Sequence, residues 1–113
     1  MPTLIDTHAH LDDGRFADDL PAVLARAAAA GVERILTIGI DLSTSRASVA
    51  LAAKYPTLAA AVAIQPNHVA EADPGDFDEI VRLAEADPRV VAVGETGLDR
   101  YWDRAPFDLQ EDF

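Results

Sequence analysis

The segment TLIDTHAHLD, residues 3–12, decides the fold, because an apolar run typical of a β-strand ends there in two closely spaced histidines. Side chains alternate across a strand, so Asp6, His8 and His10 are expected to point to the same side. Two imidazoles at this spacing suit one zinc ion or another divalent transition metal. The alternative is a pair of solvated histidines in a loop. The apolar run before the pair and Asp12 after it favour the metal site.

Three more short runs have the same character. They are nearly continuously apolar, which is typical of parallel strands that are covered on both faces of a sheet. The four predicted strands are TLIDTH (3–8), RILTIGI (34–40), LAAAVAI (58–64) and VVAVGET (90–96).

The segments between these strands carry apolar residues at helical spacing. Gly31 stands where a glycine is expected after a helix, and Ser43 or Ser45 is expected to cap the second helix. Asp73 is expected to cap the third helix, with Pro74 at its first position. The predicted helical segments are residues 17–31, 43–56 and 73–88, and RAPFDLQEDF (104–113) is expected to open a fourth.

This alternation predicts an α/β fold, in which each strand returns to a parallel sheet through a crossover helix. The sequence contains no linker, repeat or low-complexity tract. We therefore expect residues 1–113 to form a single unit of about four β/α repeats.

Candidate site residues are sought at the carboxyl ends of the strands, where ligands of parallel α/β proteins gather. At the end of the fourth strand, Glu95 continues the row of Val91 and Val93. A carboxylate at this position is costly unless it is paired, and metal coordination removes that cost. The alternative is an ion pair between Glu95 and Arg34 or Arg100.

Weaker candidates follow the other strands. Gln65 and His68, after the third strand, are candidate substrate contacts, and so is Asp99 after the fourth. Asp99 is equally suited to hold a turn. Asp41 and Ser43, after the second strand, are more typical of helix caps than of ligands.

The composition limits the classes of function. The chain has 20 acidic and 9 basic residues and a net charge of −11, which excludes nucleic-acid binding through a broad basic surface. A metal site can still handle phosphates, because bound cations supply local positive charge. The absence of cysteine excludes disulfides, a thiolate zinc site and a cysteine nucleophile. No apolar run approaches the ~18 residues of a membrane span and no signal peptide is recognisable, so we expect a cytoplasmic protein without membrane contacts.

The motifs IDTHAHLD (5–12) and GETGLDRYW (94–102) together resemble those of the TatD family of metal-dependent deoxyribonucleases, in the amidohydrolase superfamily. The resemblance covers essentially the whole chain. It implies a (β/α)8 TIM barrel, of which this chain is the N-terminal half, and cleavage of phosphodiester bonds in DNA by a two-metal-activated water. It also implies two divalent ions, such as zinc, magnesium or manganese, held by His8, His10 and Glu95. The catalytic role of Glu95 would be to bridge these ions.

Two features depart from the family pattern. The family usually has a histidine before the proline that follows the third strand, where this chain has Gln65 before Pro66. An amide cannot act as a general acid or base, although it can hydrogen-bond a phosphate, and His68 is expected to substitute in part. The second departure is length, because a (β/α)8 barrel needs roughly 250 residues. We therefore expect a longer protein, whose C-terminal half or another copy of the chain completes the barrel.

Two other functions stay open on the sequence. One is a different hydrolase of the same superfamily, which would cleave a small ester, lactone or amide at the same metal site. The other is a truncated half-barrel without turnover, which would serve as an oligomer or binding module.

Overall fold

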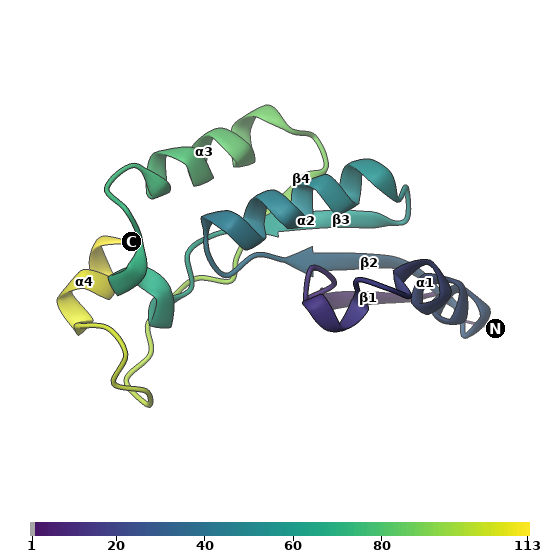
Figure 1. The fold of residues 1–113 in the computed structure, drawn as a ribbon, viewed down its shortest axis with the longest axis horizontal. Helices are drawn as coiled ribbons and strands as arrows, with labels where there is room; N and C mark the ends of the chain where they lie inside the picture. Colours follow the sequence, from purple (N-terminus) through teal and green to yellow (C-terminus); the bar gives the residue numbers. More distant parts are fainter. Residues whose placement is uncertain (1) are drawn as a thin grey trace.

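The computed structural model describes residues 2–113. Four strands form one parallel sheet in the order β1-β2-β3-β4, with α2 and α3 along one face of it (Figure 1). Within residues 2–113, no helix combines the length and the apolar character needed to cross a bilayer. The elements are β1 (Leu4–Ala9), η1 (Gly14–Phe16), α1 (Leu20–Ala29), β2 (Val32–Ile38), α2 (Leu42–Lys54), β3 (Leu58–Val62), η2 (Pro66–Glu71), α3 (Asp76–Ala86), β4 (Val90–Val93) and α4 (Phe107–Asp112).

This element order confirms the predicted parallel α/β fold. All three strand pairs are parallel, so the carboxyl ends of the strands lie at the same edge of the sheet. In Figure 1 the arrows of β2 and β3 point toward this edge, beyond which η2, α4 and the segment before α4 are found. Within residues 2–113, the elements without a counterpart among the predictions are the short 3-10 helices η1 and η2.

The core lies between the sheet and its helices, in two clusters. Alternate side chains of the central strands β2 and β3 face the helical layer, as a period of two requires. The first cluster of buried residues joins β2 and β3 to α1 and α2 and contains Leu11, Leu20, Ile35, Ala52, Leu58 and Ala60. The second lies under η2, α3 and the segment before α4 and contains Val62, Ile64, Val69, Ile80 and Ala105.

The prediction that all four strands are covered on both faces is wrong for the two edge strands within the described residues. Ile5 of β1 is 63% exposed, and Val91 and Val93 of β4 are 62% and 67% exposed. The reason is that β1 and β4 each have one neighbouring strand, and helices cover only one face of the sheet here. Their apolar sequences match a fully enclosed sheet, whereas within residues 2–113 only β2 and β3 have a neighbouring strand on each side.

The second helix begins earlier than predicted. Its cap is Asp41, which confirms the expectation that Asp41 is a cap and not a ligand, whereas Ser43 and Ser45 lie inside the helix. The Asp41 carboxylate accepts a hydrogen bond from the Thr44 N–H at 2.8 Å. The Thr44 hydroxyl completes a capping box by accepting from the Asp41 N–H at 3.0 Å. Ser45 is fully buried and has a tertiary role. Its hydroxyl donates to the Ala63 carbonyl and accepts from the Ala63 N–H, both at 3.2 Å, which joins α2 to the end of β3.

The third helix begins later than predicted, at Asp76, with Gly75 as its cap instead of Asp73. Residues 73–75 form a turn in which the Asp76 carboxylate accepts from the Asp73 N–H at 3.0 Å, so Pro74 lies outside the helix. The first helix ends as predicted, since Gly31 follows it with a φ of 91°, which favours glycine.

Gly39, immediately after β2, is a point of close backbone approach. A Cβ at this position would lie 2.2 Å from the Ser45 Oγ, 2.6 Å from its Cα and 2.8 Å from its backbone nitrogen. Backbone atoms cannot rotate away as a flexible side chain can. Glycine therefore allows the start of α2 to pack directly on the end of β2.

We predict that Gly39→Ala lowers the free energy of unfolding by about 2 kcal/mol or more, because the added methyl group must displace the α2 backbone. The matched control is Gly14→Ala, where a Cβ would meet nothing within 4 Å and the change should stay within about 0.5 kcal/mol. Urea unfolding of both variants measures the difference. Equal free energies of unfolding for the two variants would show that α2 can accommodate a methyl group at position 39, and would contradict the prediction.

Candidate metal centre

His8 and His10 meet at the carboxyl end of β1. Their Nε2 atoms lie 3.3 Å apart, and the two rings are nearly perpendicular, at 78°. The Asp6 carboxylate accepts a hydrogen bond from the His8 N–H at 3.0 Å, which fixes the backbone where the strand ends. The two imidazoles thus converge, as the alternation of side chains predicts.

The orientation of the His10 ring is set by β2. Its Nδ1 lies 3.0 Å from the carbonyl oxygen of Ile38, and that oxygen can only accept, so Nδ1 carries the proton and donates. The Nε2 of a neutral His10 is then unprotonated and offers a lone pair to a ligand. A metal-binding histidine is typically oriented in this way by a backbone carbonyl.

Glu95 reaches the same point from β4. Beyond Val93 the chain turns toward β2, because the Gly94 N–H donates to the Val62 carbonyl and the Glu95 N–H donates to the Gly39 carbonyl at 3.1 Å. The Glu95 Oε2 then lies 3.4 Å from the His8 Nε2 and 3.7 Å from the His10 Nε2.

Neither Arg34 nor Arg100, the two alternative partners of Glu95, forms an ion pair with it in the structure. The Arg34 guanidinium donates to the Pro56 carbonyl at 2.9 Å, at the other end of the sheet. The Arg100 guanidinium lies over the Phe107 ring, 3.7 Å from its centre. The ionisable partners of Glu95 are the two histidines.

These three side chains fit a divalent cation. One ligand atom from each of His8, His10 and Glu95 lies within 4.8 Å of the others. Ligands about 2.1 Å from a tetrahedral ion are separated by about 3.4 Å, close to the distances between these atoms. Two imidazole nitrogens and a carboxylate oxygen suit zinc and similar transition ions. The side chains are one-third to one-half exposed, so the cluster is accessible from solvent.

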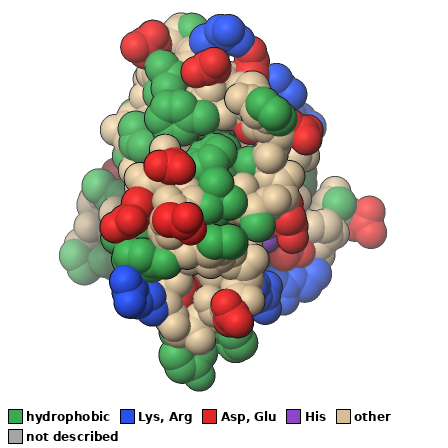
Figure 2. Space-filling model, turned by 90° about the vertical axis from the view of Figure 1, so that its left-hand side faces the viewer, with side chains coloured by type: hydrophobic (Ala, Val, Ile, Leu, Met, Phe, Trp, Pro, Cys, Tyr) green, Lys and Arg blue, Asp and Glu red, His purple; other side chains and the backbone are tan. Residues whose placement is uncertain are grey.

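A hollow of about 450 Å³ adjoins the cluster and includes His10 and Glu95 in its wall. Asp12 also lies in this wall, and its partial burial raises the pKa of its carboxyl above the ordinary value of 3.8. Asp13 beside it accepts two hydrogen bonds from the Arg15 guanidinium, at 3.0 and 3.1 Å, and these lower the pKa of its carboxyl. Figure 2 looks onto this end of the molecule and shows a small histidine surface near acidic and apolar side chains.

Gln65 and His68, the two predicted substrate contacts after β3, lie in the walls of two different hollows. Gln65 lies in the wall of the hollow beside the metal cluster, and its side-chain oxygen accepts from the Asn67 N–H at 2.9 Å, which caps η2. His68 lies in the wall of a different, smaller hollow, where its Nδ1 is 3.5 Å from a Glu71 carboxylate oxygen. The structure therefore brings Gln65, but not His68, to the candidate metal centre.

Asp99 holds a turn. One carboxylate oxygen accepts from the Tyr101 and Trp102 N–H groups at 2.7 and 3.3 Å, and the other accepts from the Asn67 amide at 2.9 Å. The Gln110 amide, almost fully buried, accepts from the Asp99 N–H and donates to the Asp99 carbonyl.

Asn67 and Gln110 were not identified from the sequence. Both are uncharged side chains in short helices, and their partner Asp99 lies far along the chain from Asn67. No periodicity links such residues. A weak signal exists only at the start of η2, where Gln65 precedes Pro66 in a pattern compatible with a capped turn.

Comparison with known proteins agrees with this geometry. The family model described as TatD related DNase matches residues 5–113. The "Uncharacterized metal-dependent hydrolase YabD" of Bacillus subtilis is 38% identical over 96% of this chain and 42% of its own length. The "3'-5' ssDNA/RNA exonuclease TatD" of Salmonella typhimurium is 36% identical over 85% of this chain and 36% of its own length.

The fold is shared with a solved relative. The crystal structure of YJJV, a TatD homologue from Escherichia coli K12, matches with a TM-score of 0.87 and 35% identity. The match covers 96% of this chain and 42% of that one. The four β/α units therefore correspond to the N-terminal half of a TIM barrel, and the chain spans about two fifths of the length of these relatives.

We predict that the intact protein binds Zn²⁺ and that His10→Ala and Glu95→Gln each weaken binding by more than about tenfold, because each removes a ligand atom. His68→Ala is the matched control, since it removes the third histidine from a separate hollow. Isothermal titration calorimetry with ZnCl₂ measures the affinities. An equal loss of Zn²⁺ affinity in the His68→Ala variant would argue against a metal site formed by His8, His10 and Glu95.

A second prediction concerns acid. Hydrogen bonds from the Asn67 amide and the turn hold the pKa of Asp99 below its ordinary value of 3.8. The resulting stabilisation is complete above about pH 3.8 and is lost as the pH falls through the lowered pKa. Wild type should therefore exceed Asp99→Asn in free energy of unfolding by a constant amount between pH 7 and pH 5, and by less at pH 3. Urea unfolding at these three pH values tests this, and a constant difference down to pH 3 would contradict it.

Proposed function

Because the chain belongs to the TatD family, we propose that it forms one half of a metal-dependent phosphodiesterase site that cleaves DNA or a related nucleic acid. The observation that carries the proposal is the convergence of His8, His10 and Glu95 within 4.8 Å at the carboxyl edge of the sheet. Relatives named as metal-dependent hydrolases and as single-strand exonucleases support it.

The proposed cofactor is a pair of divalent ions. When bound, such ions lower the pKa of a water and offset negative charge on the phosphate and leaving oxygens. His8 and His10 would each bind through Nε2, with His10 held in the correct tautomer by the Ile38 carbonyl. Glu95 would be shared between the ions, because a carboxylate offers two oxygens.

Gln65 is the proposed substrate contact of this half. It lies beside His10 and Glu95 in the wall of the hollow, and its side-chain oxygen is engaged by the Asn67 N–H. The amide nitrogen is then the group that would donate a hydrogen bond to a phosphate oxygen. An amide can position a phosphate in this way but cannot transfer a proton, so we assign it no acid–base role. His68 and Asp99 have the structural surroundings described above and are not assigned to substrate.

The site also needs the other half of the barrel. The edges of β1 and β4 each lack a second strand within residues 2–113, and exposed strand edges favour pairing. We propose that four further β/α units close the barrel at these edges, from further chain or from another copy. They would supply the remaining ligands.

Hydrolysis of a small ester or amide is the competing activity, because it would use the same three ligands. The two are separated by assaying the intact protein with added Mn²⁺ or Zn²⁺ against single-stranded DNA and against 4-nitrophenyl acetate. We expect DNA cleavage that EDTA abolishes, and faster turnover of DNA than of the ester. Ester turnover without DNA cleavage would contradict the nuclease proposal and favour hydrolysis of small esters or amides.

In the same assay, His8→Ala and Glu95→Gln should lower the rate of DNA cleavage at least about a hundredfold, because the charge-stabilising ions are lost. Their free energies of unfolding in metal-free buffer should stay within about 1 kcal/mol of wild type, since both side chains are partly exposed. His68→Ala is the control and should retain activity. A fully active Glu95→Gln variant would exclude the proposed role.

A further inference from the structure

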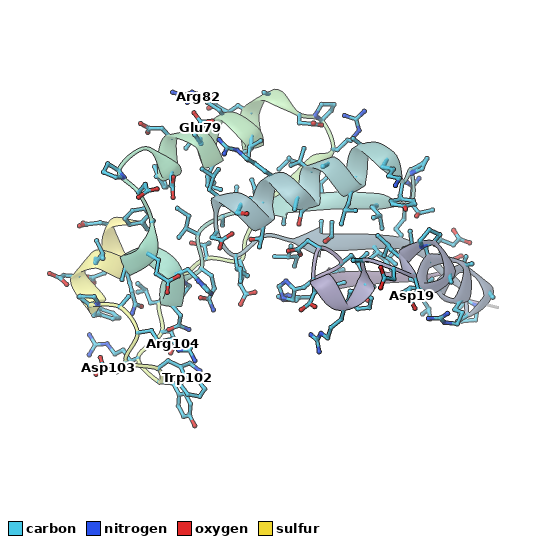
Figure 3. The ribbon with its side chains drawn as sticks, viewed as in Figure 1. Asp19, Glu79, Arg82, Trp102, Asp103 and Arg104 are labelled. Carbon is cyan, nitrogen blue, oxygen red and sulfur yellow. The ribbon has the colours of Figure 1, made fainter. Side chains whose placement is uncertain are left out.

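The loop that follows Glu95 carries two exposed aromatic side chains that the metal centre does not use. Tyr101 is 84% exposed and Trp102 is 51% exposed. Their rings contact each other edge to face, with centres 4.9 Å apart and planes at 85°. Figure 3 shows Trp102 at the tip of the loop, pointing away from the sheet. Exposed apolar side chains that contact each other indicate an interaction site more strongly than single exposed ones do.

This loop is braced at its base. The buried Gln110 amide donates to the carbonyls of Asp99 and Ala105, each at 3.0 Å, and accepts from the Asp99 N–H at 2.7 Å. One side chain therefore ties both ends of the segment 99–105 together. The Asp99 carboxylate also fixes the backbone N–H groups of Tyr101 and Trp102. The rings are thus presented from a fixed backbone, which lowers the entropic cost of binding.

The charge around the rings differs from that of the whole chain, because Arg100 and Arg104 balance Asp99 and Asp103 within residues 99–104. Arg104 lies over the Trp102 ring, 5.2 Å from its centre, and Figure 3 shows the two side by side. The Arg100 guanidinium, which precedes the pair in the sequence, lies over the Phe107 ring, 3.7 Å from its centre. Two of the chain's 9 basic residues thus flank two exposed rings, within a chain of net charge −11. A flat ligand with negative charge, such as a nucleotide, matches this combination.

The loop also stands at the edge of the sheet that holds the metal cluster. It begins four residues after Glu95, and Figure 1 shows it beyond the carboxyl ends of the strands. Asn67, which binds Asp99, belongs to the helix that Gln65 caps in the wall of the metal-site hollow. The base of the loop is therefore connected to that hollow by hydrogen bonds.

We propose that Tyr101 and Trp102 form a stacking platform for the bases of a single-stranded nucleic acid, with Arg100 and Arg104 near its phosphates. Its use in positioning a strand for cleavage rests on the function proposed above, whereas the binding itself does not. Stacking on aromatic side chains holds single strands without sequence preference, because every base has a π-face. Duplex DNA, whose bases are already stacked, is expected to bind this platform poorly.

Trp102 is the single tryptophan of residues 1–113, so the part of the fluorescence response that is lost in Trp102→Phe reports on the platform. A ten-residue oligothymidylate is titrated into the intact protein in EDTA, which prevents cleavage. We expect quenching of Trp102 that saturates. An abasic oligonucleotide of equal length, which keeps the phosphates and lacks the bases, should cause little quenching. Equal quenching by both, or quenching by neither, would overturn the proposal.

Affinity is then measured by anisotropy of a labelled oligothymidylate. Trp102→Ala should weaken binding roughly five- to hundredfold, as expected for loss of a stacked base, and Trp102→Phe should restore most of it. Phe77→Ala is the matched control, because Phe77 is an aromatic residue of α3 that is 45% exposed. Wild-type affinity in Trp102→Ala would overturn the proposal, and would indicate that the rings pack against protein instead.

A small substrate separates this proposal from the one on which it rests. Hydrolysis of bis(4-nitrophenyl) phosphate needs the metal centre but no base stacking, so Trp102→Ala should cleave it at the wild-type rate while losing activity on oligothymidylate. Absence of phosphodiester cleavage in the wild type, with base-dependent quenching intact, would refute the nuclease and leave the platform standing. If Trp102→Ala and Trp102→Phe both lose activity on both substrates, Trp102 has a structural role and the platform proposal is overturned.

Discussion

Two neighbouring carbonyl groups at the end of β2 anchor the candidate metal centre. The Ile38 carbonyl accepts from the His10 ring, and the Gly39 carbonyl accepts from the Glu95 backbone N–H. Residues from the first and the last strand of the sheet are thereby attached to one point between them. The parallel pairing of the strands makes this possible, because it places all four carboxyl ends at the same edge. The close packing of Gly39 on Ser45 then fixes that point against α2.

Buried polar side chains, more than apolar ones, set the geometry around this edge. The Ser45 hydroxyl ties α2 to the end of β3, and the Gln110 amide closes the loop after β4. Apolar contacts in the two core clusters stabilise the layers but have little directional preference. A hydrogen bond is directional, and an unpaired buried polar group is costly, so these residues fix positions that hydrophobic packing leaves free.

The same edge combines two modes of recognition in the proposals made above. The cluster of His8, His10 and Glu95 would be a compact site for a phosphate, and the exposed pair Tyr101 and Trp102 would be an open surface for flat groups. An acidic chain that cannot attract nucleic acid through its overall charge would then bind it through ions and stacking. The exposed edges of β1 and β4 indicate where further β/α units would enclose the site.

The order of strands and helices was predictable from the sequence, because the apolar periods are local properties. The convergence of His8, His10 and Glu95 was predictable too, since strand parity and parallel pairing follow from the same pattern. The choice of Asp41 over Ser43 and Ser45 as the cap of α2, the cap of α3 at Gly75 and the exposed faces of the edge strands were not predictable. They depend on neighbours that the local pattern does not specify.

Only the tertiary structure joined Asp99 to Asn67 and Gln110, and separated Gln65 from His68. The physical reason is that a hydrogen bond between distant residues leaves no period in the sequence, whereas a strand or a helix does.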